Sequence, residues 1–189
     1  MGDKVKFPRA AALAVAKELC DIQRICDRLI VAGSLRRRKL AVGDVEILYI
    51  PKFAREPDGL FDHKLVKLVD VALEEMLKAG IIAKRRNVNG SVMWGEKNKL
   101  AVHVSSGIPV DFFAATEANW FNYLVCRTGG SENNVTICNS AIAKGWKWNP
   151  YGSGFSRQKG LGEETAAMIS ERAVFEFVGL PYKEPWERQ

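Results

Sequence analysis

Two acidic side chains, Asp44 and Glu46, lie two positions apart in a stretch that is otherwise apolar, with Val45, Ile47 and Leu48 around them. Alternate residues of a β-strand share one face, so this spacing predicts that both carboxylates point the same way while Val45 and Ile47 point into the core. Neighbouring carboxylates repel each other, and a divalent cation is a common way to relieve that repulsion. The motif therefore predicts a metal site on a strand.

A third acid, Asp111, lies in a second apolar strand predicted at residues 109–113. A buried carboxylate needs a partner, although the pattern is also compatible with an aspartate that faces water at a sheet edge. Three carboxylates can hold two divalent ions about 3.5–4 Å apart, which suits an in-line phosphoryl transfer. Mg²⁺ prefers oxygen ligands and accepts phosphate and water, so two Mg²⁺ ions, with Mn²⁺ as a substitute, are the predicted cofactors.

The residues just before the acidic strand have the chemistry to bind phosphates. Gly33 and Ser34 end an apolar strand and precede a basic run at residues 36–39. Glycine allows a phosphate to approach the backbone closely, Ser34 is predicted to cap a short helix, and Arg37 offers a guanidinium fork. A solvated basic turn is the alternative for the run taken alone. Its position before Asp44 favours phosphate binding.

Hydrophobic periodicity predicts the elements that must position these residues. Helical patterns begin near Arg9, near Leu65, at Ser131 as a cap and at about Ser170, whereas short strands are expected within residues 81–113 and 146–155. Residues 51–59 are predicted to be a polar connection. These patterns predict an α+β protein with an α/β half and a mainly helical half, divided near residue 115.

Composition narrows the class of partner and the cellular setting. The 189-residue chain carries a formal net charge of +6, which favours polyanionic partners, nucleic acid first, over a merely soluble basic surface. No apolar run of membrane-spanning length occurs, and the first eight residues lack the apolar core of a secretory signal. The four cysteines form no CxxC pair, as expected for reduced thiols. A cytoplasmic or nuclear protein with no membrane partner is expected.

Several segments resemble those of family X DNA polymerases, within the polymerase-beta-like nucleotidyltransferase superfamily, and occur in the same order. They are Gly33-Ser-Leu-Arg-Arg37, Gly43-Asp-Val-Glu46, Pro109-Val-Asp111, Thr128-Gly129, Lys144-Gly145 and the segment 174–188. The resemblance covers nearly the whole chain and implies a nucleotidyltransferase palm at residues 1–115, a mixed sheet with helices on one face. A smaller, mainly helical subdomain with a short hairpin, at residues 116–189, would close over the nucleotide and DNA. Without a lyase domain, this would be a minimal form.

The resemblance also implies roles for individual residues. Asp44, Glu46 and Asp111 match the metal-binding and catalytic carboxylates, with Asp111 best placed to activate a primer 3′-hydroxyl. The residues implied to bind the incoming nucleotide are Gly33, Ser34, Arg37, Gly43, Arg9, Gly129 and Asn134. The predicted DNA-binding residues are Arg127, Lys147 and Arg157, the last two in a segment that mixes cations with aromatic side chains, most of which are expected in the core.

The predicted function is transfer of a deoxynucleoside monophosphate to a primer 3′-hydroxyl with release of pyrophosphate, in short-gap filling during DNA repair. Gapped or primer-template DNA and deoxynucleoside triphosphates are the expected partners of a monomeric enzyme. A repair protein is a further expected partner, which would strengthen its binding to DNA. Lys84, Arg85 and Arg86 are predicted to form a solvent-facing strand edge, with a DNA-backbone contact as the alternative.

Three departures from the family pattern keep other functions open. Glu46 stands where DNA polymerases of this family usually have aspartate, Cys126-Arg127 replaces an aromatic pair, and Cys138 replaces an arginine that senses the template. Arg127 and Cys138 leave a template-independent terminal transferase, or an enzyme that accepts ribonucleotides, as alternatives. A non-catalytic DNA-binding module is a third hypothesis. It is disfavoured because a protein that only binds phosphates gains nothing from three extra negative charges.

Overall fold

The computed structural model describes residues 5–59 and 62–189, and the chain packs as two units. The first unit comprises the chain up to Val31 together with Leu40–Ala114, and the second comprises Ala32–Lys39 together with Ala115–Gln189. Residues 32–39, which the sequence order placed in the first predicted domain, therefore pack with the second unit. Residues 1–4, on which part of the prediction about a secretory signal depends, lie outside the described residues.

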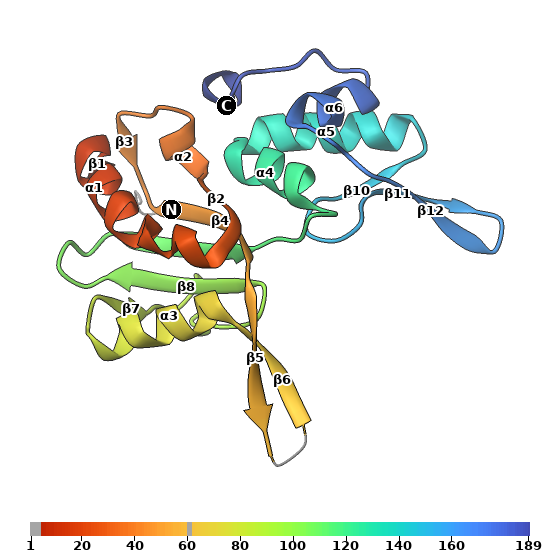
Figure 1. The fold of residues 1–189 in the computed structure, drawn as a ribbon. Coiled ribbons are helices and arrows are strands. Elements are labelled where there is room, and N and C mark those ends of the chain that lie inside the picture. Colours follow the sequence, from red (N-terminus) through yellow and green to blue (C-terminus); the bar gives the residue numbers. More distant parts are fainter. Residues whose placement is uncertain (1–4, 60–61) are drawn as a thin grey trace. The chain divides into compact units, whose positions relative to one another are not determined.

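A five-stranded sheet organises the first unit (Figure 1). Its strands β4 and β9 are parallel and its other pairs are antiparallel, so the sheet is mixed, as predicted. In spatial order the strands are β2 (Cys26–Val31), β4 (Val45–Pro51), β9 (Pro109–Ala114), β8 (Asn98–His103) and β7 (Ile82–Lys84).

Two helices, α1 (Arg9–Leu19) and α3 (Leu68–Lys78), cover one face of this sheet (Figure 1). Alternate residues of β8 show that both helices lie on the same side, because Lys99 bonds to Asp70 of α3 at 2.9 Å and His103 lies 3.4 Å from Glu18 of α1. The predicted α+β class, with helices on one face, is confirmed. No helix within the described ranges is long and apolar enough to cross a bilayer.

The prediction of a polar connection at residues 51–59 is wrong. These residues instead contribute β5 (Phe53–Asp58), which pairs with β6 (Asp62–Lys67) in an antiparallel hairpin. The hairpin escaped prediction because its mostly exposed side chains show no alternation of apolar and polar residues. The helix predicted from Leu65 begins at Leu68, since the residues before it belong to β6. A short pair, β1 (Phe7–Pro8) with β3 (Ala41–Val42), completes the unit.

The second unit is mainly helical, as predicted, and has a three-stranded antiparallel sheet in place of the predicted short hairpin. Its core contains the aromatic residues Trp148 and Phe155, whose ring centroids lie 6.1 Å apart, while Lys147 and Arg157 remain exposed. The helices are α2 (Gly33–Arg36), α4 (Trp120–Thr128), α5 (Ser131–Ala143) and α6 (Glu171–Phe177), and the strands are β10 (Lys147–Asn149), β11 (Gly154–Lys159) and β12 (Gly162–Ala166).

Both predicted helix caps, Ser34 and Ser131, are wrong. Gly33 has a φ of 61° and already begins α2, so Ser34 lies inside the helix and Ala32 occupies the cap position. Gly130 caps α5 in place of Ser131. Ser170, by contrast, caps α6 by accepting a hydrogen bond from the backbone N–H of Ala173 at 3.0 Å.

Candidate active site

The face of the sheet opposite α1 and α3 carries the three acids. The parallel register of β4 and β9 sets Glu46 directly beside Asp111, and Asp44 precedes Glu46 by two residues just before β4 begins. Val45 and Ile47, on the helix-covered face, are fully buried, as the two-residue spacing predicted. Residues about 65 positions apart in sequence thus become neighbours through strand pairing.

The acids suit a hard divalent cation chemically, because all three offer carboxylate oxygens. Their side chains do not converge in this structure: among the described residues, no three His, Cys, Asp or Glu side chains are arranged to hold a metal ion. Asp111, which is 8% exposed, instead forms an ion pair between its Oδ1 and Nη2 of Arg85. The donor set therefore fits the predicted ion, and one of its members is engaged by an arginine.

Arg85 was not predicted to contact an acid. In a strand, Lys84 and Arg86 point to one face and Arg85 points to the opposite face. This alternation is the signal in the sequence that could have identified Arg85 as the exception. A pocket of about 480 Å³ lies beside the ion pair, with Arg85 and Asp44 on its wall. The complete lining is Val5, Phe7, Gly43, Asp44, Arg85, Val88, Gly107 and Pro109. Arg9, also in the first unit, is the first residue of α1.

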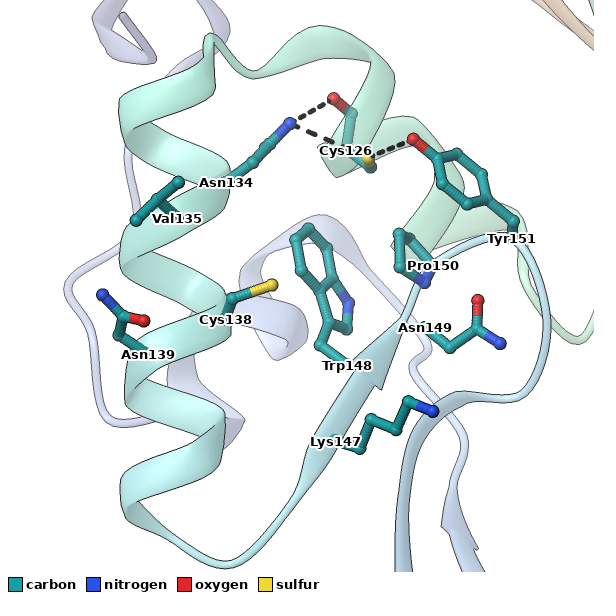
Figure 2. Close-up of a pocket in the computed structure, with 10 residues that line it drawn as sticks. All are labelled: Cys126, Asn134, Val135, Cys138, Asn139, Lys147, Trp148, Asn149, Pro150 and Tyr151. Atoms are coloured by element: carbon teal, nitrogen blue, oxygen red, sulfur yellow. Dashed lines mark hydrogen bonds between the residues drawn. The ribbon is translucent and has the colours of Figure 1, made fainter.

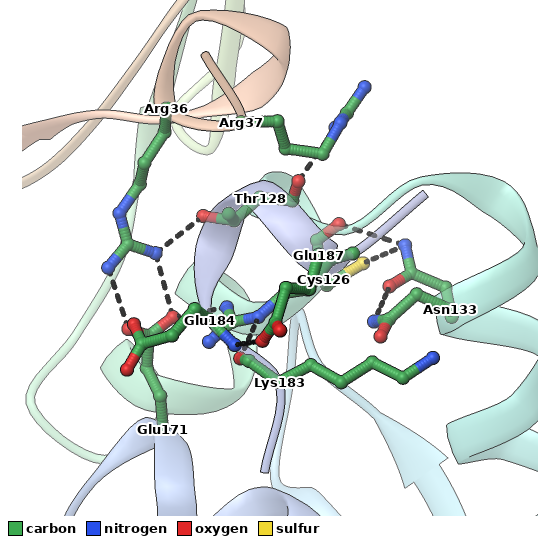
Figure 3. A network of polar contacts seen from close by, with 11 residues as sticks. Arg36, Arg37, Cys126, Thr128, Asn133, Glu171, Lys183, Glu184 and Glu187 are labelled. Atoms are coloured by element: carbon green, nitrogen blue, oxygen red, sulfur yellow. Dashed lines mark hydrogen bonds and ion pairs between the residues drawn. The ribbon is translucent and has the colours of Figure 1, made fainter.

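The Gly33–Arg37 turn belongs to the second unit. Ser34 Oγ is buried and has no hydrogen-bond partner among the described residues. A buried hydroxyl without a partner is costly, so a ligand oxygen at this position would be favourable. Arg37 donates from Nη1 to the backbone oxygen of Thr128 at 2.7 Å (Figure 3).

Arg36, within this turn, is held in a network centred on Glu171 (Figure 3). Its guanidinium makes a two-pronged contact with Glu171 at 2.7 and 2.6 Å and also donates to Thr128 Oγ1 at 2.8 Å. Arg188, which is fully buried, donates to the same carboxylate at 2.6 Å. Sequence analysis missed Glu171, because an acid in the first turn of a helix is common and its two arginine partners are distant in sequence.

Asn134, one of the predicted nucleotide-binding residues, lines a second pocket, of about 620 Å³, within the second unit (Figure 2). Asn134 donates to the backbone oxygen of Cys126 at 2.8 Å, and the Cys126 thiol shares a 3.2 Å hydrogen bond with the Tyr151 hydroxyl. Partial burial, followed by the hydrogen bond to Cys126, raises the pKa of Tyr151 above its ordinary value of 10.0, so this hydroxyl stays neutral. Cys138 and Lys147 also line the pocket.

The other two predicted DNA-binding residues lie against aromatic rings. The Arg127 guanidinium lies 5.1 Å from the ring centroid of Tyr151, and that of Arg157 lies 4.4 Å from Trp146. Arg157 also forms an ion pair with Glu164 at 2.8 Å. Both guanidinium groups therefore lie over aromatic rings, and arginine in such a position can also bind a base or a phosphate.

Gly129 is closely packed against the side chains of Asn133 and Asn134. A Cβ atom at this position would clash with Asn134 Oδ1 and would lie 2.7 Å from Asn133 Nδ2. We expect Gly129→Ala to lower the free energy of unfolding by about 1–3 kcal/mol. Gly162→Ala, where the nearest atom is 3.9 Å away, is the matched control, with a change of at most about 0.5 kcal/mol expected. Urea denaturation measures both, and equal stability of the two variants would refute the packing requirement.

Comparison with known proteins bears on the second unit. Residues 123–189 match the family described as DNA polymerase beta thumb. The match includes most of α4 and all of α5 and α6, and therefore the second pocket, Glu171 and Arg188. It supports a relationship to family X-like polymerases and points to DNA binding. No curated protein matches the chain.

Proposed function

We propose that this protein is a metal-dependent nucleotidyltransferase that adds a deoxynucleoside monophosphate to a primer 3′-hydroxyl and releases pyrophosphate. The observation that carries the proposal is the parallel register that sets Glu46 beside Asp111, with Asp44 two residues before Glu46, just ahead of the strand. The thumb match at residues 123–189 supports DNA as the substrate. The proposed setting is short-gap filling in DNA repair, inside the cell.

The three carboxylates would bind the metal ions, and one of them would accept the proton of the 3′-hydroxyl. Asp44, Glu46 and Asp111 are the proposed ligands of two Mg²⁺ ions, which when bound stabilise negative charge on the attacking and leaving oxygens. Asp111 accepts the proton of the 3′-hydroxyl while that oxygen attacks the α-phosphorus of the nucleotide. A new phosphodiester bond forms, and the bond to the β-phosphate oxygen breaks to release pyrophosphate.

The turn in the second unit is proposed to bind the triphosphate. Ser34 Oγ, which has no hydrogen-bond partner among the described residues, donates to a phosphate oxygen. Gly33 gives the backbone close access, and the guanidinium of Arg37 supplies positive charge. The remaining proposed nucleotide contacts are Gly43, Arg9, Gly129 and Asn134. The proposed DNA contacts are Arg127, Lys147 and Arg157.

Primer extension tests this function. Wild-type protein with Mg²⁺ is expected to insert one complementary nucleotide into a one-nucleotide gap, whereas Asp44→Ala is expected to be inactive because a metal ligand is lost. Chelation by EDTA should stop the wild type, and Mn²⁺ should restore it. Equal incorporation by wild type and Asp44→Ala would refute the assignment.

A second candidate function concerns which nucleotide is chosen. The small side chains of Cys126 and Cys138 lie on the wall of the second pocket, where they leave room for a bulkier or unpaired nucleotide. The same assay with ribonucleotides, and with a single-stranded primer, separates the candidates. Efficient ribonucleotide insertion favours relaxed sugar choice, and extension of the single strand favours a terminal transferase.

A further inference from the structure

Four residues form a row across four neighbouring chain segments on the acidic face of the sheet. The backbone N–H of Arg85 donates to Leu100 at 3.1 Å, continuing the pairing of β7 with β8. Leu100 is opposite Asp111 on β9, and Asp111 is opposite Glu46 on β4. Residues that are directly paired in a sheet point to the same face, so Arg85 shares its face with both acids.

The ion pair in this row is largely shielded from water, and its arginine side chain is incompletely satisfied. The side chains of Arg85 and Asp111 are 27% and 11% exposed. Arg85 contacts the carboxylate through Nη2, while its Nη1 reaches the backbone oxygen of Arg86 at 3.5 Å. Nε of Arg85 is buried without a hydrogen-bond partner in the described ranges. A guanidinium held through one nitrogen is less firmly fixed than a bidentate one.

We propose that Arg85 is the resident counter-cation of this carboxylate face, and that a divalent cation binds Asp111 by displacing it. The inference deepens the proposed function, since it concerns the same carboxylates. Glu46 beside Asp111 places two negative charges on adjacent strands, and Arg85 offsets part of that repulsion. Arg85 occupies Oδ1 of Asp111 and brings a positive charge to this carboxylate, so binding of a divalent cation there and contact with Arg85 oppose each other.

Arg85→Gln tests the competition, with Arg86→Gln as the matched control. Arg86 is the next residue, is exposed and donates to the backbone oxygen of Gly90, so its variant loses the same charge. An arginine beside an aspartate changes the affinity of the carboxylate for a proton by about ten- to a thousandfold. We expect Arg85→Gln to lower the dissociation constant for Mn²⁺ at least about tenfold, and Arg86→Gln to change it by less than about twofold.

Free Mn²⁺ is counted by electron paramagnetic resonance in a titration without nucleotide or DNA. Tighter binding by Arg85→Gln alone supports the proposal; equal effects in both variants, weaker binding by Arg85→Gln, or no binding by any form overturns it. An NMR titration of the wild-type protein with Mg²⁺ tests the proposal without any variant, so it does not depend on a variant folding correctly. Mg²⁺ should shift the guanidinium ¹⁵N resonances of Arg85 and leave those of Arg86 unchanged. Incorporation by wild type decides the proposed function separately, so the two can fail independently.

Discussion

Asp111→Asn is expected to lower the rate of nucleotide incorporation by about a thousandfold, the scale of a lost general base. Asparagine keeps the shape of the side chain and can still accept a hydrogen bond from Arg85. It cannot accept the proton of the 3′-hydroxyl, and it is a much poorer ligand for a divalent cation because it carries no charge. Single-turnover incorporation into a one-nucleotide gap measures the chemical step without the contribution of product release.

The matched control for this change is Asp21→Asn, which removes an exposed carboxylate whose 3.3 Å ion pair with Arg24 lies at the surface. Its rate is expected to equal that of wild type, because surface ion pairs contribute little. DNA binding should persist in Asp111→Asn, since the proposed DNA contacts lie in the second unit. An Asp111→Asn rate within about threefold of wild type would show that this residue neither accepts the proton nor holds an essential ion.

Glu171→Gln is expected to have the largest effect on stability, lowering the free energy of unfolding by about 3–5 kcal/mol. The carboxylate is contacted by two arginines, and one of them, Arg188, has no exposed surface. Removing the negative charge leaves both positive charges without their ionic partner in a shielded position. Glu164→Gln is the control, because the pair of Glu164 with Arg157 is partly exposed and should contribute at most about 1 kcal/mol.

The same network predicts a dependence on pH. Burial alone would raise the pKa of Glu171, but the hydrogen bond from Arg36 and the charges of Arg188 and Arg36 outweigh it and lower the pKa below 4.5. A pKa lowered by folding stabilises the protein fully above the unfolded value near 4.5, and this stabilisation is lost as the pH falls through the lower folded value. Wild type should therefore lose stability more steeply below pH 4.5 than Glu171→Gln. Urea denaturation at a series of pH values measures the free energy of unfolding of both proteins. The same dependence on pH in wild type and Glu171→Gln would contradict this role.

The sequence was sufficient to predict features that depend on local patterns. The alternation around Asp44 and Glu46 predicted which side chains face the core, because strand parity depends only on neighbouring residues. The start of helix α1 and strand β9 were also predicted, because hydrophobic periodicity is likewise a local pattern. The hairpin of β5 and β6 was not predicted, because its strands are defined by hydrogen bonding to each other and not by an alternating apolar pattern in the sequence.

The resemblance implied that Asp44, Glu46 and Asp111 share one site, but the exact pairing between distant segments could not be predicted from the sequence. The pairing of Glu46 with Asp111 follows from the parallel register of β4 and β9, for which the residues carry no local signal. The same is true of Arg85 with Asp111, and of Glu171 with Arg36 and Arg188. The roles of Ser34 and Arg37 in binding phosphate remain predictions, although the unpartnered hydroxyl of Ser34 supports its role.

The most direct test of the central claim is the mass of the primer after incubation of wild-type protein with gapped DNA, deoxynucleoside triphosphates and Mg²⁺. The proposed function predicts that the primer gains the mass of one deoxynucleoside monophosphate, that an equal amount of pyrophosphate appears, and that EDTA prevents both. An unchanged primer, together with DNA binding that is equally tight in Mg²⁺ and in EDTA, would contradict nucleotidyl transfer and identify the protein as a DNA-binding module.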